Sequence, residues 1–424
     1  MHKGRCLRRS LPPSFHRYQV DQRVWHVPVP SSSTAQEVVV VVVVCVCVSV
    51  CLCVALCVCV CVRARVHVCD GCRSTSTTSR GCVQALKYIA ESITAADVPP
   101  IMTQVYAKSG VNGCLDFLFN LTKPSIAKYF LDELQGQADG SGLDLALFHR
   151  VAMLGELTKM GCSMIGAWGP AVSRTSGLVQ LRALDWDTDG PFQAYPVVLV
   201  RHPSGGGQNA FATVGWAGDV GAITGYSSAG VGISEKVWIH YAGKSSWSGT
   251  PTTFALRDIL QFSTDLDGAI AHVREINRTN SIFIGVGSKK DGQFRALEYA
   301  HDNVTVWSDS TGPDYGNHTR RPGLVYVDKH TQPDPGQGAW CLDTLMAQHY
   351  GHLDAASIVE QIAPVYQTGD SQVVVYDFQR DYMYVTYPSV SGWPSHRLNV
   401  TKAYDRPSTR FDMAALFAEP NDTK

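Results

Sequence analysis

The sequence has almost no net charge. Its 36 Lys and Arg residues balance 37 Asp and Glu residues, which gives a formal charge of -1 over 424 residues. A protein whose main partner is a nucleic acid needs a basic surface to bind phosphates, so this balance argues against a nucleic acid as the main partner. The hydrophobic content of 45% is enough for a full core, as one large domain or as two ordinary ones.

Internal repeats and paired metal-binding motifs are also lacking. Cys69-Asp-Gly-Cys72 is not followed by a second C-x-x-C pair, which a four-cysteine zinc site requires. We therefore expect neither a metal nor a cofactor.

Residues 1–80 do not have the composition of a globular fold. A basic start is followed by a nearly unbroken apolar run from Val38 to Val62. This run exceeds the ~20 residues that cross a membrane as a helix, so a signal peptide or a membrane anchor is one interpretation. The run is largely Val alternating with Cys, which suits a helix poorly. A GT dinucleotide repeat encodes the same alternation, so an error in the gene model is the alternative. In both cases we exclude residues 1–80 from the fold.

Few of the 14 cysteines bear on the folded part of the chain. Seven lie in the Val-Cys run and three more flank it. Those that remain are Cys82, Cys114, Cys162 and Cys341. If Cys162 is free, Cys341 can pair with Cys114 or with Cys82, and the sequence does not choose between them.

Six Asn-x-Ser/Thr sequons favour passage through the secretory pathway to a lysosomal or extracellular location. They begin at Asn120, Asn277, Asn303, Asn317, Asn399 and Asn421.

The hydrophobic period changes from helical to strand-like at Gly161. Helices are predicted at 85–93, 115–134, 143–157, 253–262, 266–276, 340–349 and 355–365. Strands are predicted at 163–167, 178–184, 195–202, 210–215, 231–241, 281–286, 295–300, 304–307, 324–327, 372–378 and 382–387. Runs of strands separated by helix pairs predict an α+β fold with two stacked antiparallel sheets and helices outside. The predicted organisation is a leader at 1–80, a helical segment at 81–161 and a main domain at 162–424.

Three motifs carry a family resemblance. They are Leu-Thr-Lys-Met-Gly-Cys162-Ser-Met-Ile, Gly177-x4-Arg182-x-x-Asp185-Trp, and Gly-Tyr-Ser-Ser-Ala-Gly230-Val-Gly-Ile-Ser-Glu-Lys. Together they resemble the N-terminal-nucleophile amidohydrolases, within which acid ceramidase, N-acylethanolamine acid amidase, cholylglycine hydrolase and isopenicillin N acyltransferase are most similar. The resemblance implies a four-layer αββα sandwich and a precursor that cleaves itself between Gly161 and Cys162. It also implies that residues 81–161 are a pro-segment that stays bound after cleavage.

Such chemistry needs a cysteine at a chain start. The α-amine of an N-terminal Cys162, with an ordinary pKa near ~7.7, can act as the general base for its own thiol. By resemblance, Asp185 orients this amine, while Arg182 holds Asp185 and lowers the pKa of the thiol. A cysteine that starts a strand is commonly only a buried small hydrophobe. Moreover, residues three apart on a strand point to opposite faces unless a bulge or a strand end intervenes.

The oxyanion partner departs from the family pattern. The family places an Asn on a late strand, whereas this sequence has Asp328 there. An ionised Asp328 would repel an oxyanion, so the alternatives are a protonated Asp328, Asn280 or backbone amides.

The sequence thus predicts an autoprocessed cysteine amidohydrolase that cleaves a linear amide of a small-molecule or lipid N-acyl compound. The alternatives are a phospholipase-B-like ester hydrolase and an inactive relative that serves as a binding or surface protein.

Overall fold

The computed structural model describes most of the chain after residue 101. The described ranges are 102–157, 161–186, 188, 196–203, 206–238, 241–244, 246–312, 318–329, 340–391 and 399–419. Before them, Val24–Trp25, Glu37–Val42 and positions 83, 86, 87, 91 and 94 are described.

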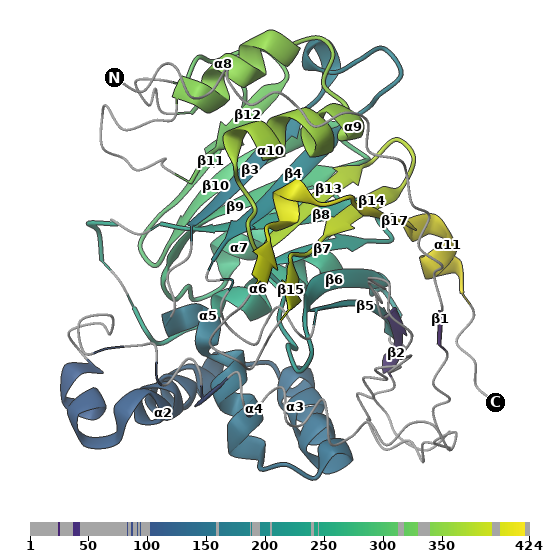
Figure 1. Ribbon diagram of the computed structural model, residues 1–424. Coiled ribbons are helices and arrows are strands. Elements are labelled where there is room, and N and C mark those ends of the chain that lie inside the picture. The colour runs from purple at the N-terminus through teal and green to yellow at the C-terminus, as the bar shows by residue number, and fades with distance from the viewer. Residues whose placement is uncertain are drawn as a thin grey trace.

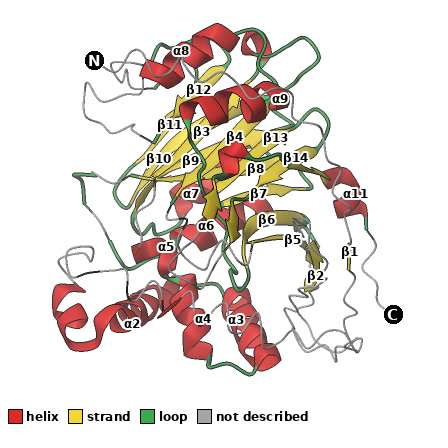
Figure 2. Cartoon of the chain, in the orientation of Figure 1, coloured by secondary structure: helices red, strands yellow, loops and turns green. Residues whose placement is uncertain are grey.

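Two antiparallel sheets pack face to face and carry helices on their outer faces (Figures 1 and 2). A buried cluster that includes Met164, Phe283, Phe294, Tyr376 and Phe378 fills the space between the sheets. The α+β class, with its four-layer arrangement of helices, two sheets and helices, is confirmed.

The larger sheet has nine strands. In spatial order they are β1 (Val24–Trp25), β2 (Glu37–Val42), β5 (Pro196–Pro203), β6 (Phe211–Trp216), β7 (Thr224–Ser227), β8 (Val231–Val237), β9 (Ser281–Ser288), β10 (Gln293–Ala300) and β11 (Val304–Trp307). Helices α6 (Thr252–Phe262) and α7 (Leu266–Glu275) pack on its outer face through a cluster that includes Leu256, Ile259 and Val273.

The second sheet has six strands. In spatial order they are β12 (Leu324–Val327), β3 (Gly161–Ala167), β4 (Val179–Asp185), β13 (Gln372–Asp377), β14 (Tyr382–Thr386) and β17 (Thr409–Asp412). Its outer face is covered by α8 (Trp340–His349), α9 (Ala355–Ser357), a π-helical turn (Ile358–Ile362) and α10 (Ala363–Tyr366). A small hairpin of β15 (Ser389–Ser391) and β16 (Asn399–Thr401) and the helix α11 (Met413–Ala418) complete the described C-terminal part.

Inner strands have no exposed face. All seven residues of β8, Val-Gly-Ile-Ser-Glu-Lys-Val, are buried because one face meets the other sheet and the opposite face meets α6. Strands covered on both sides lose the simple alternation of polar and apolar residues. Polar residues at such positions, Glu235 and Lys236 among them, are therefore unusual enough to require an explanation.

A helical segment precedes the sandwich and lies below it in Figure 1. It consists of α2 (Thr103–Thr122), α3 (Lys128–Ser141), α4 (Leu145–Ala152) and α5 (Leu154–Leu157). A single helix was predicted over 115–134, but α2 ends at Thr122 and Lys123-Pro124-Ser125 form a 3-10 turn, because Pro124 cannot extend an α-helix. The strand that follows begins at Gly161, where the change of period predicted it.

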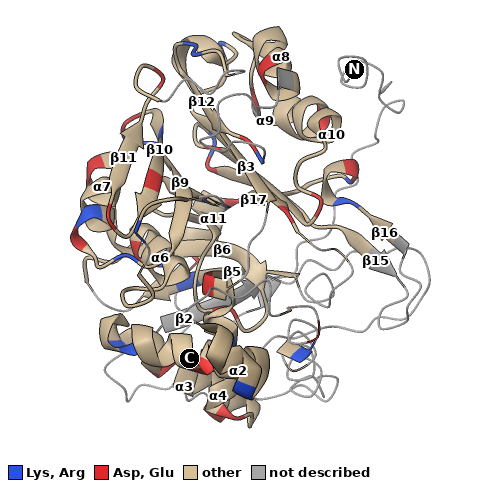
Figure 3. Ribbon diagram, turned by 90° about the vertical axis from the view of Figure 1, so that its left-hand side faces the viewer, with Lys and Arg blue, Asp and Glu red and all other residues tan. Residues whose placement is uncertain are grey.

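Buried charges join the helical segment to the sandwich. Glu133 of α3 pairs with Arg257 of α6, and its Oε1 lies 3.4 Å from Nε of Arg201 in β5. Glu156 of α5 accepts hydrogen bonds of 2.6 Å from both the backbone N–H and the hydroxyl of Thr252. Elsewhere, Figure 3 shows charged positions of both signs scattered over helices and strands.

The leader was predicted to lie outside the fold, but two short parts of it are strands. β2, which includes the first residues of the Val-Cys run, pairs with β5, and β1 pairs with β2. The rest of the run up to Val62 lies outside the described residues. No helix of the described part of the chain is both long and apolar enough to cross a membrane.

The cysteine and sequon predictions have different outcomes. Cys341 is disulfide-bonded to a partner outside the described residues. Cys114 is free and buried, so the proposed pairing with Cys114 is wrong.

The sequon residues Asn120, Asn277 and Asn303 are exposed, as a glycan requires. The side chain of Asn399 and the residues Asn317 and Asn421 lie outside the described parts, and glycosylation stays a prediction.

Candidate functional site

The predicted nucleophile lies where two neighbouring strands meet the helical segment. β3 and β4 are antiparallel, with Gly161 opposite Asp185 and Cys162 opposite Leu184. Arg182 lies two positions before Leu184 and therefore shares the face of Cys162, as its diagonal neighbour. The register, more than the spacing in sequence, brings these side chains together.

The thiol of Cys162 contacts two charged side chains. Sγ lies 3.7 Å from Nη2 of Arg182 and 3.9 Å from Oε2 of Glu235 in β8. Nη2 of Arg182 also donates to Oε2 of Glu235 at 3.4 Å. All three side chains are buried, and they come from both sheets, so they lie in the space between the sheets.

The surroundings keep this thiol protonated. Burial raises the pKa of Cys162 to about 12, while Arg182 lowers it and Glu235 and Asp185 raise it. Burial also raises the pKa of Glu235, against the lowering effect of Arg182. At neutral pH the thiol of the intact chain is therefore neutral, and a neutral thiol is a weak nucleophile.

Arg182 has hydrogen-bonding capacity to spare. Its Nε and Nη1 atoms are buried and have no hydrogen-bond partner within the described part of the chain. Buried donors are usually satisfied, so two unsatisfied N–H groups on one guanidinium beside a thiol can serve an oxygen acceptor that enters the site.

Asp185 lies at the end of β4 but points away from Arg182. Its carboxylate accepts hydrogen bonds from the hydroxyl of Thr368 at 2.8 Å and from the backbone N–H of Gly369 at 2.9 Å. Nζ of Lys329 lies 3.6 Å from its Oδ1. The contact between Arg182 and Asp185 that the family resemblance implies is replaced by the pair of Arg182 with Glu235. Residues three apart on a strand face opposite ways, and the strand does not bulge here.

The electrostatics of Asp185 reflect its half-enclosed position. Burial raises the pKa of its carboxyl, whereas Lys329 and the hydrogen bond from Thr368 lower it. Thr368 also lies 2.7 Å from the hydroxyl of Ser163, the residue that follows Cys162. Asp185 is thus connected to the start of β3 from the side opposite to Arg182.

The two candidates for the oxyanion site form contacts with residues other than Cys162. Asp328 is fully buried, and its Oδ2 lies 2.6 Å from Nε2 of His318. It follows β12, whose Val327 pairs with Met164 and faces the space between the sheets, so Asp328 faces the other way, toward the covering helices.

Asn280 is similarly displaced. It donates from Nδ2 to the carbonyl of Glu156 at 3.5 Å and from its backbone N–H to the carbonyl of Ser246 at 3.2 Å. Its φ of 52° marks it as a tight turn before β9. These contacts give it a role in joining the helical segment to the sandwich.

Sequence reasoning missed Glu235 and Lys236 as members of the site. Lys236 is buried, donates to the carbonyl of Val237 at 3.1 Å and lies 5.2 Å from the ring centre of Phe283. Burial lowers its pKa, and the thiol of Cys162 raises it. The available signal was an adjacent Glu and Lys inside a strand that is otherwise apolar and small.

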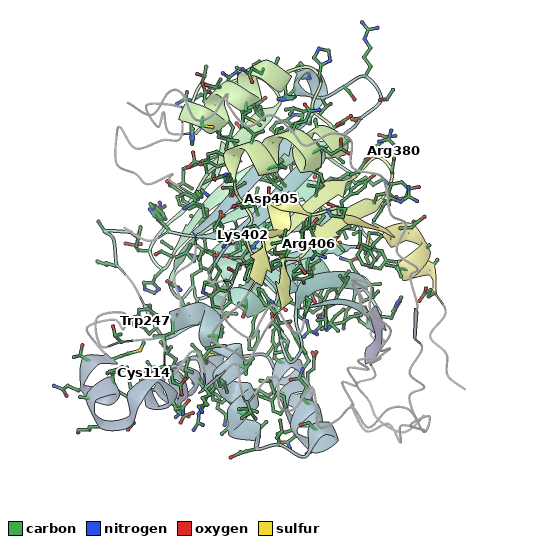
Figure 4. The ribbon with its side chains drawn as sticks, viewed as in Figure 1. Cys114, Trp247, Arg380, Lys402, Asp405 and Arg406 are labelled. Carbon is green, nitrogen blue, oxygen red and sulfur yellow. The ribbon has the colours of Figure 1, made fainter. Side chains whose placement is uncertain are left out.

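The helical segment covers the site with apolar side chains. Cys162, Leu184, Trp216 and Phe254 belong to a cluster that also contains the cores of α2 to α5. Cys114 and Trp247, both labelled in Figure 4, belong to this cluster or pack against it. A ligand that reaches Cys162 from this side meets a hydrophobic environment.

Within the described residues, no group of three or more His, Cys, Asp or Glu side chains is placed to hold a metal ion.

Comparison with known sequences gives two related proteins of Dictyostelium discoideum. Protein dcd1A is 37% identical over 334 residues, which cover 76% of this chain and 74% of dcd1A. The chain belongs to the dcd1 family. Protein dcd1B is 33% identical over 347 residues, which cover 79% of this chain and 68% of dcd1B. No protein-family model matches this dcd1 family member.

Solved structures similar to this dcd1 family member include an ortholog of N-acylethanolamine-hydrolyzing acid amidase from Caenorhabditis elegans. It is 13% identical, and the match covers 51% of this chain and 93% of the ortholog, with a TM-score of 0.39. Penicillin V acylase from Agrobacterium tumefaciens is 11% identical, and the match covers 57% of this chain and 86% of the acylase, with a TM-score of 0.35. A conjugated bile acid hydrolase variant from Clostridium perfringens is 8% identical, and the match covers 58% of this chain and 96% of the hydrolase, with a TM-score of 0.34.

Proposed function

We propose that the chain is the precursor of a cysteine amidohydrolase that cleaves itself between Gly161 and Cys162 and then hydrolyses a linear amide. The contact of the Cys162 thiol with Arg182 and Glu235 carries the proposal. An ordinary buried cysteine lies among apolar groups, whereas this thiol lies beside an ion pair at the start of a strand.

Self-cleavage is an acyl shift followed by hydrolysis. The sulfur of Cys162 attacks the carbonyl carbon of Gly161, a thioester forms, and the bond from that carbon to the nitrogen of Cys162 breaks. The proton lost by the thiol ends on the departing amine. Water then hydrolyses the thioester, which leaves a carboxylate on Gly161 and restores the thiol of Cys162.

Cleavage supplies what the intact site lacks. In the precursor, burial raises the pKa of the thiol to about 12, and the nitrogen of Cys162 is an amide that cannot act as a base. The new α-amine of Cys162 is a base within the same residue, with an ordinary pKa near ~7.7. Arg182 then stabilises the thiolate at close range, and Asp185, beside the start of β3, orients the amine.

Amide hydrolysis follows the same route. The thiolate attacks the substrate carbonyl, the amine leaves with the proton taken up by the α-amine, and water releases the acid from the acyl-enzyme. The unsatisfied Nε and Nη1 of Arg182 are the donors that best suit the oxyanion. In this proposal they take the role that the sequence assigned to Asp328 or Asn280.

The substrate that we propose is an N-acyl compound with an apolar acyl group. The cluster that holds Cys162 is formed by Leu184, Trp216, Phe254 and the helical segment, and burial of an acyl chain there is favourable at about 25 cal/mol per Å². An N-acyl lipid or an N-acyl amino compound meets this requirement.

The proposal extends to processing and location. The buried carboxylates of Glu133 and Glu156 support a helical fragment that stays bound after cleavage. Exposed sequons at Asn120, Asn277 and Asn303 support a glycoprotein of the secretory pathway, lysosomal or extracellular. Digestion with an N-glycosidase, followed by mass spectrometry for a mass shift at these residues, measures this directly.

One variant tests the central step. Wild-type protein is expected to yield a fragment whose N-terminal residue is Cys162, and Cys162→Ala is expected to remain one chain. Cys114→Ala is the matched control, because Cys114 is also buried and free but lies in α2. Normal cleavage of Cys162→Ala, or a wild-type chain that stays intact and hydrolyses no acyl amide, would refute the assignment and favour the inactive relative. A paired panel of acyl amides and esters separates the amidase from the ester hydrolase.

A further inference from the structure

Lys329 lies beside the bond that is proposed to break. In β12, Val327 pairs with Met164 of β3. Lys329 follows β12 by two residues, and its backbone N–H donates to the hydroxyl of Ser163 at 3.1 Å. Lys329 therefore flanks the start of β3 on the side opposite to β4.

Gly161 lies between Lys329 and Asp185. A Cβ atom added to Gly161 would lie 3.4 Å from Cβ of Asp185 and 3.9 Å from Cβ of Lys329. The side chains of a cation and an anion thus begin next to the residue that supplies the scissile carbonyl. Across this residue, Nζ of Lys329 lies 3.6 Å from Oδ1 of Asp185.

The ammonium group of Lys329 is held in place by a second contact. Nζ donates to the carbonyl of Gln367 at 2.6 Å and lies 5.5 Å from the ring centre of Tyr366. Gln367 has a φ of 57° that turns its carbonyl at the end of α10. An ammonium carries three N–H groups, so bonds to Gln367 and Asp185 leave capacity for one more acceptor.

Cleavage creates two charges at this place. Hydrolysis of the Gly161–Cys162 bond by one water gives a carboxylate on Gly161 and an ammonium on Cys162, so the net charge is unchanged. Before cleavage the site holds one cation and one anion, Lys329 and Asp185. After cleavage it holds two of each.

We propose that Lys329 is a positioning residue for maturation: it neutralises Asp185 in the precursor and, once the bond is cut, binds the new carboxylate of Gly161 while Asp185 takes the new ammonium of Cys162. This exchange rests on the proposed self-cleavage. It gives each new chain end a counter-charge that is already in place, which disfavours resealing of the bond and holds the Cys162 amine next to its thiol.

The test compares charge with bulk. Lys329→Met and Lys329→Gln remove the charge and keep a long side chain, while Lys329→Arg keeps the charge. Each is made by cell-free translation, and the appearance of the Cys162 fragment is followed over time. The two neutral variants are expected to be cleaved about tenfold more slowly than wild type, as for loss of one charge-assisted hydrogen bond. Lys329→Arg is expected to be cleaved within about threefold of wild type.

A second readout concerns the product. Carboxypeptidase added to the cleaved protein is expected to trim the helical fragment from Gly161 faster in Lys329→Met than in wild type, because the carboxylate is no longer held. Lys128→Met is the control, since Lys128 forms an exposed pair with Asp132 in α3. Thermal unfolding of every variant shows whether it is folded, and Lys329→Gln replaces Lys329→Met if the latter is not.

The outcomes separate the two proposals. Cleavage of the neutral variants at the wild-type rate, or equal slowing of Lys329→Arg and Lys329→Met, overturns the role of Lys329 and leaves the cleavage itself standing. A wild-type chain that behaves like Cys162→Ala overturns the cleavage and the role of Lys329 together.

Discussion

Nη2 of Arg182 lies 3.7 Å from Sγ of Cys162, and the same nitrogen donates to the carboxylate of Glu235. The guanidinium therefore divides its positive charge between a thiol and a buried acid. How strongly Arg182 favours the thiolate depends on whether Glu235 is charged. The charge of Glu235 therefore affects the pKa of the Cys162 thiol.

We expect Glu235→Gln to lower the pKa of the Cys162 thiol. The negative charge of Glu235 raises this pKa and also offsets Arg182, so a neutral Gln leaves Arg182 to act on the thiol alone. Alkylation of Cys162 by iodoacetamide, followed by mass spectrometry across pH, should show a midpoint below that of wild type. Cys114 in the same molecule serves as reference, and an unchanged or higher midpoint for Cys162 contradicts the prediction.

Glu156→Gln should stabilise the protein at neutral pH. Burial raises the pKa of Glu156 above its ordinary value of 4.5, so the folded state binds its proton more tightly than the unfolded state. The free energy of unfolding therefore falls as pH rises from the unfolded pKa through the folded one. Gln keeps an oxygen that can accept from Thr252 without this loss.

The measurement for Glu156 is the midpoint of thermal unfolding at pH 4 and at pH 7.5. The variant should exceed wild type at pH 7.5 and match it at pH 4. Glu360→Gln, on the exposed surface, should change neither midpoint. A variant that is less stable than wild type at pH 7.5 would mean that the Thr252 bonds need a charged acceptor.

Glu133→Gln should weaken the attachment of the helical segment. It removes the negative charge of Glu133 from beside the buried guanidiniums of Arg201 and Arg257, and loss of one partner of a buried ion pair costs about 3–5 kcal/mol. We expect a lower urea midpoint in the intact chain and earlier separation of the fragments in the cleaved one.

The neighbouring residue supplies the control for Glu133. Asp132 pairs with Lys128 at 2.6 Å on the exposed side of the same helix. Asp132→Asn should alter the free energy of unfolding by no more than about 1 kcal/mol, as exposed ion pairs do. Equal effects of the two substitutions on size-exclusion profiles in urea would show that the buried charges do not hold the segment.

Two glycines of β3 should respond differently to alanine. A Cβ at Gly161 meets Cβ of Asp185 at 3.4 Å, an ordinary contact, whereas a Cβ at Gly166 would lie 2.0 Å from the ring of Phe294. Gly161→Ala should fold with near wild-type stability and be cleaved more slowly, because the methyl group hinders attack at the carbonyl. Gly166→Ala should lose about 1–3 kcal/mol by overpacking. Unfolding midpoints and cleavage rates, measured side by side, check both expectations.

Much of the fold could be predicted because its signals are local. Alternating and apolar runs placed most strands of both sheets, and the change of period at Gly161 marked the start of β3. The short strand β7, with the sequence Thr-Gly-Tyr-Ser, was not predicted because three of its four residues are small or polar, and its pairing with β6 and β8 fixes it. Strands that are fixed by tertiary pairing of this kind are hard to predict from a short sequence window.

The site was less predictable for a physical reason. Spacing placed Cys162 and Arg182 on neighbouring strands, but contacts across the two sheets are set by the register and stacking of strands that are distant in sequence. Glu235 reaches Arg182 from the other sheet, and Asp185 turns to Thr368 and Gly369, which follow α10. No local pattern connects these residues.

β3 is an inner strand, with β12 on one side and β4 on the other. A chain end created at Cys162 would therefore be locked inside a sheet whose neighbouring strands come from later parts of the chain. Such an end can be made only after the whole chain has folded, and the separated pieces would have to find each other again from solution. The lifetime of the mature molecule would then be set by the height of its unfolding barrier, with no route back once that barrier is crossed.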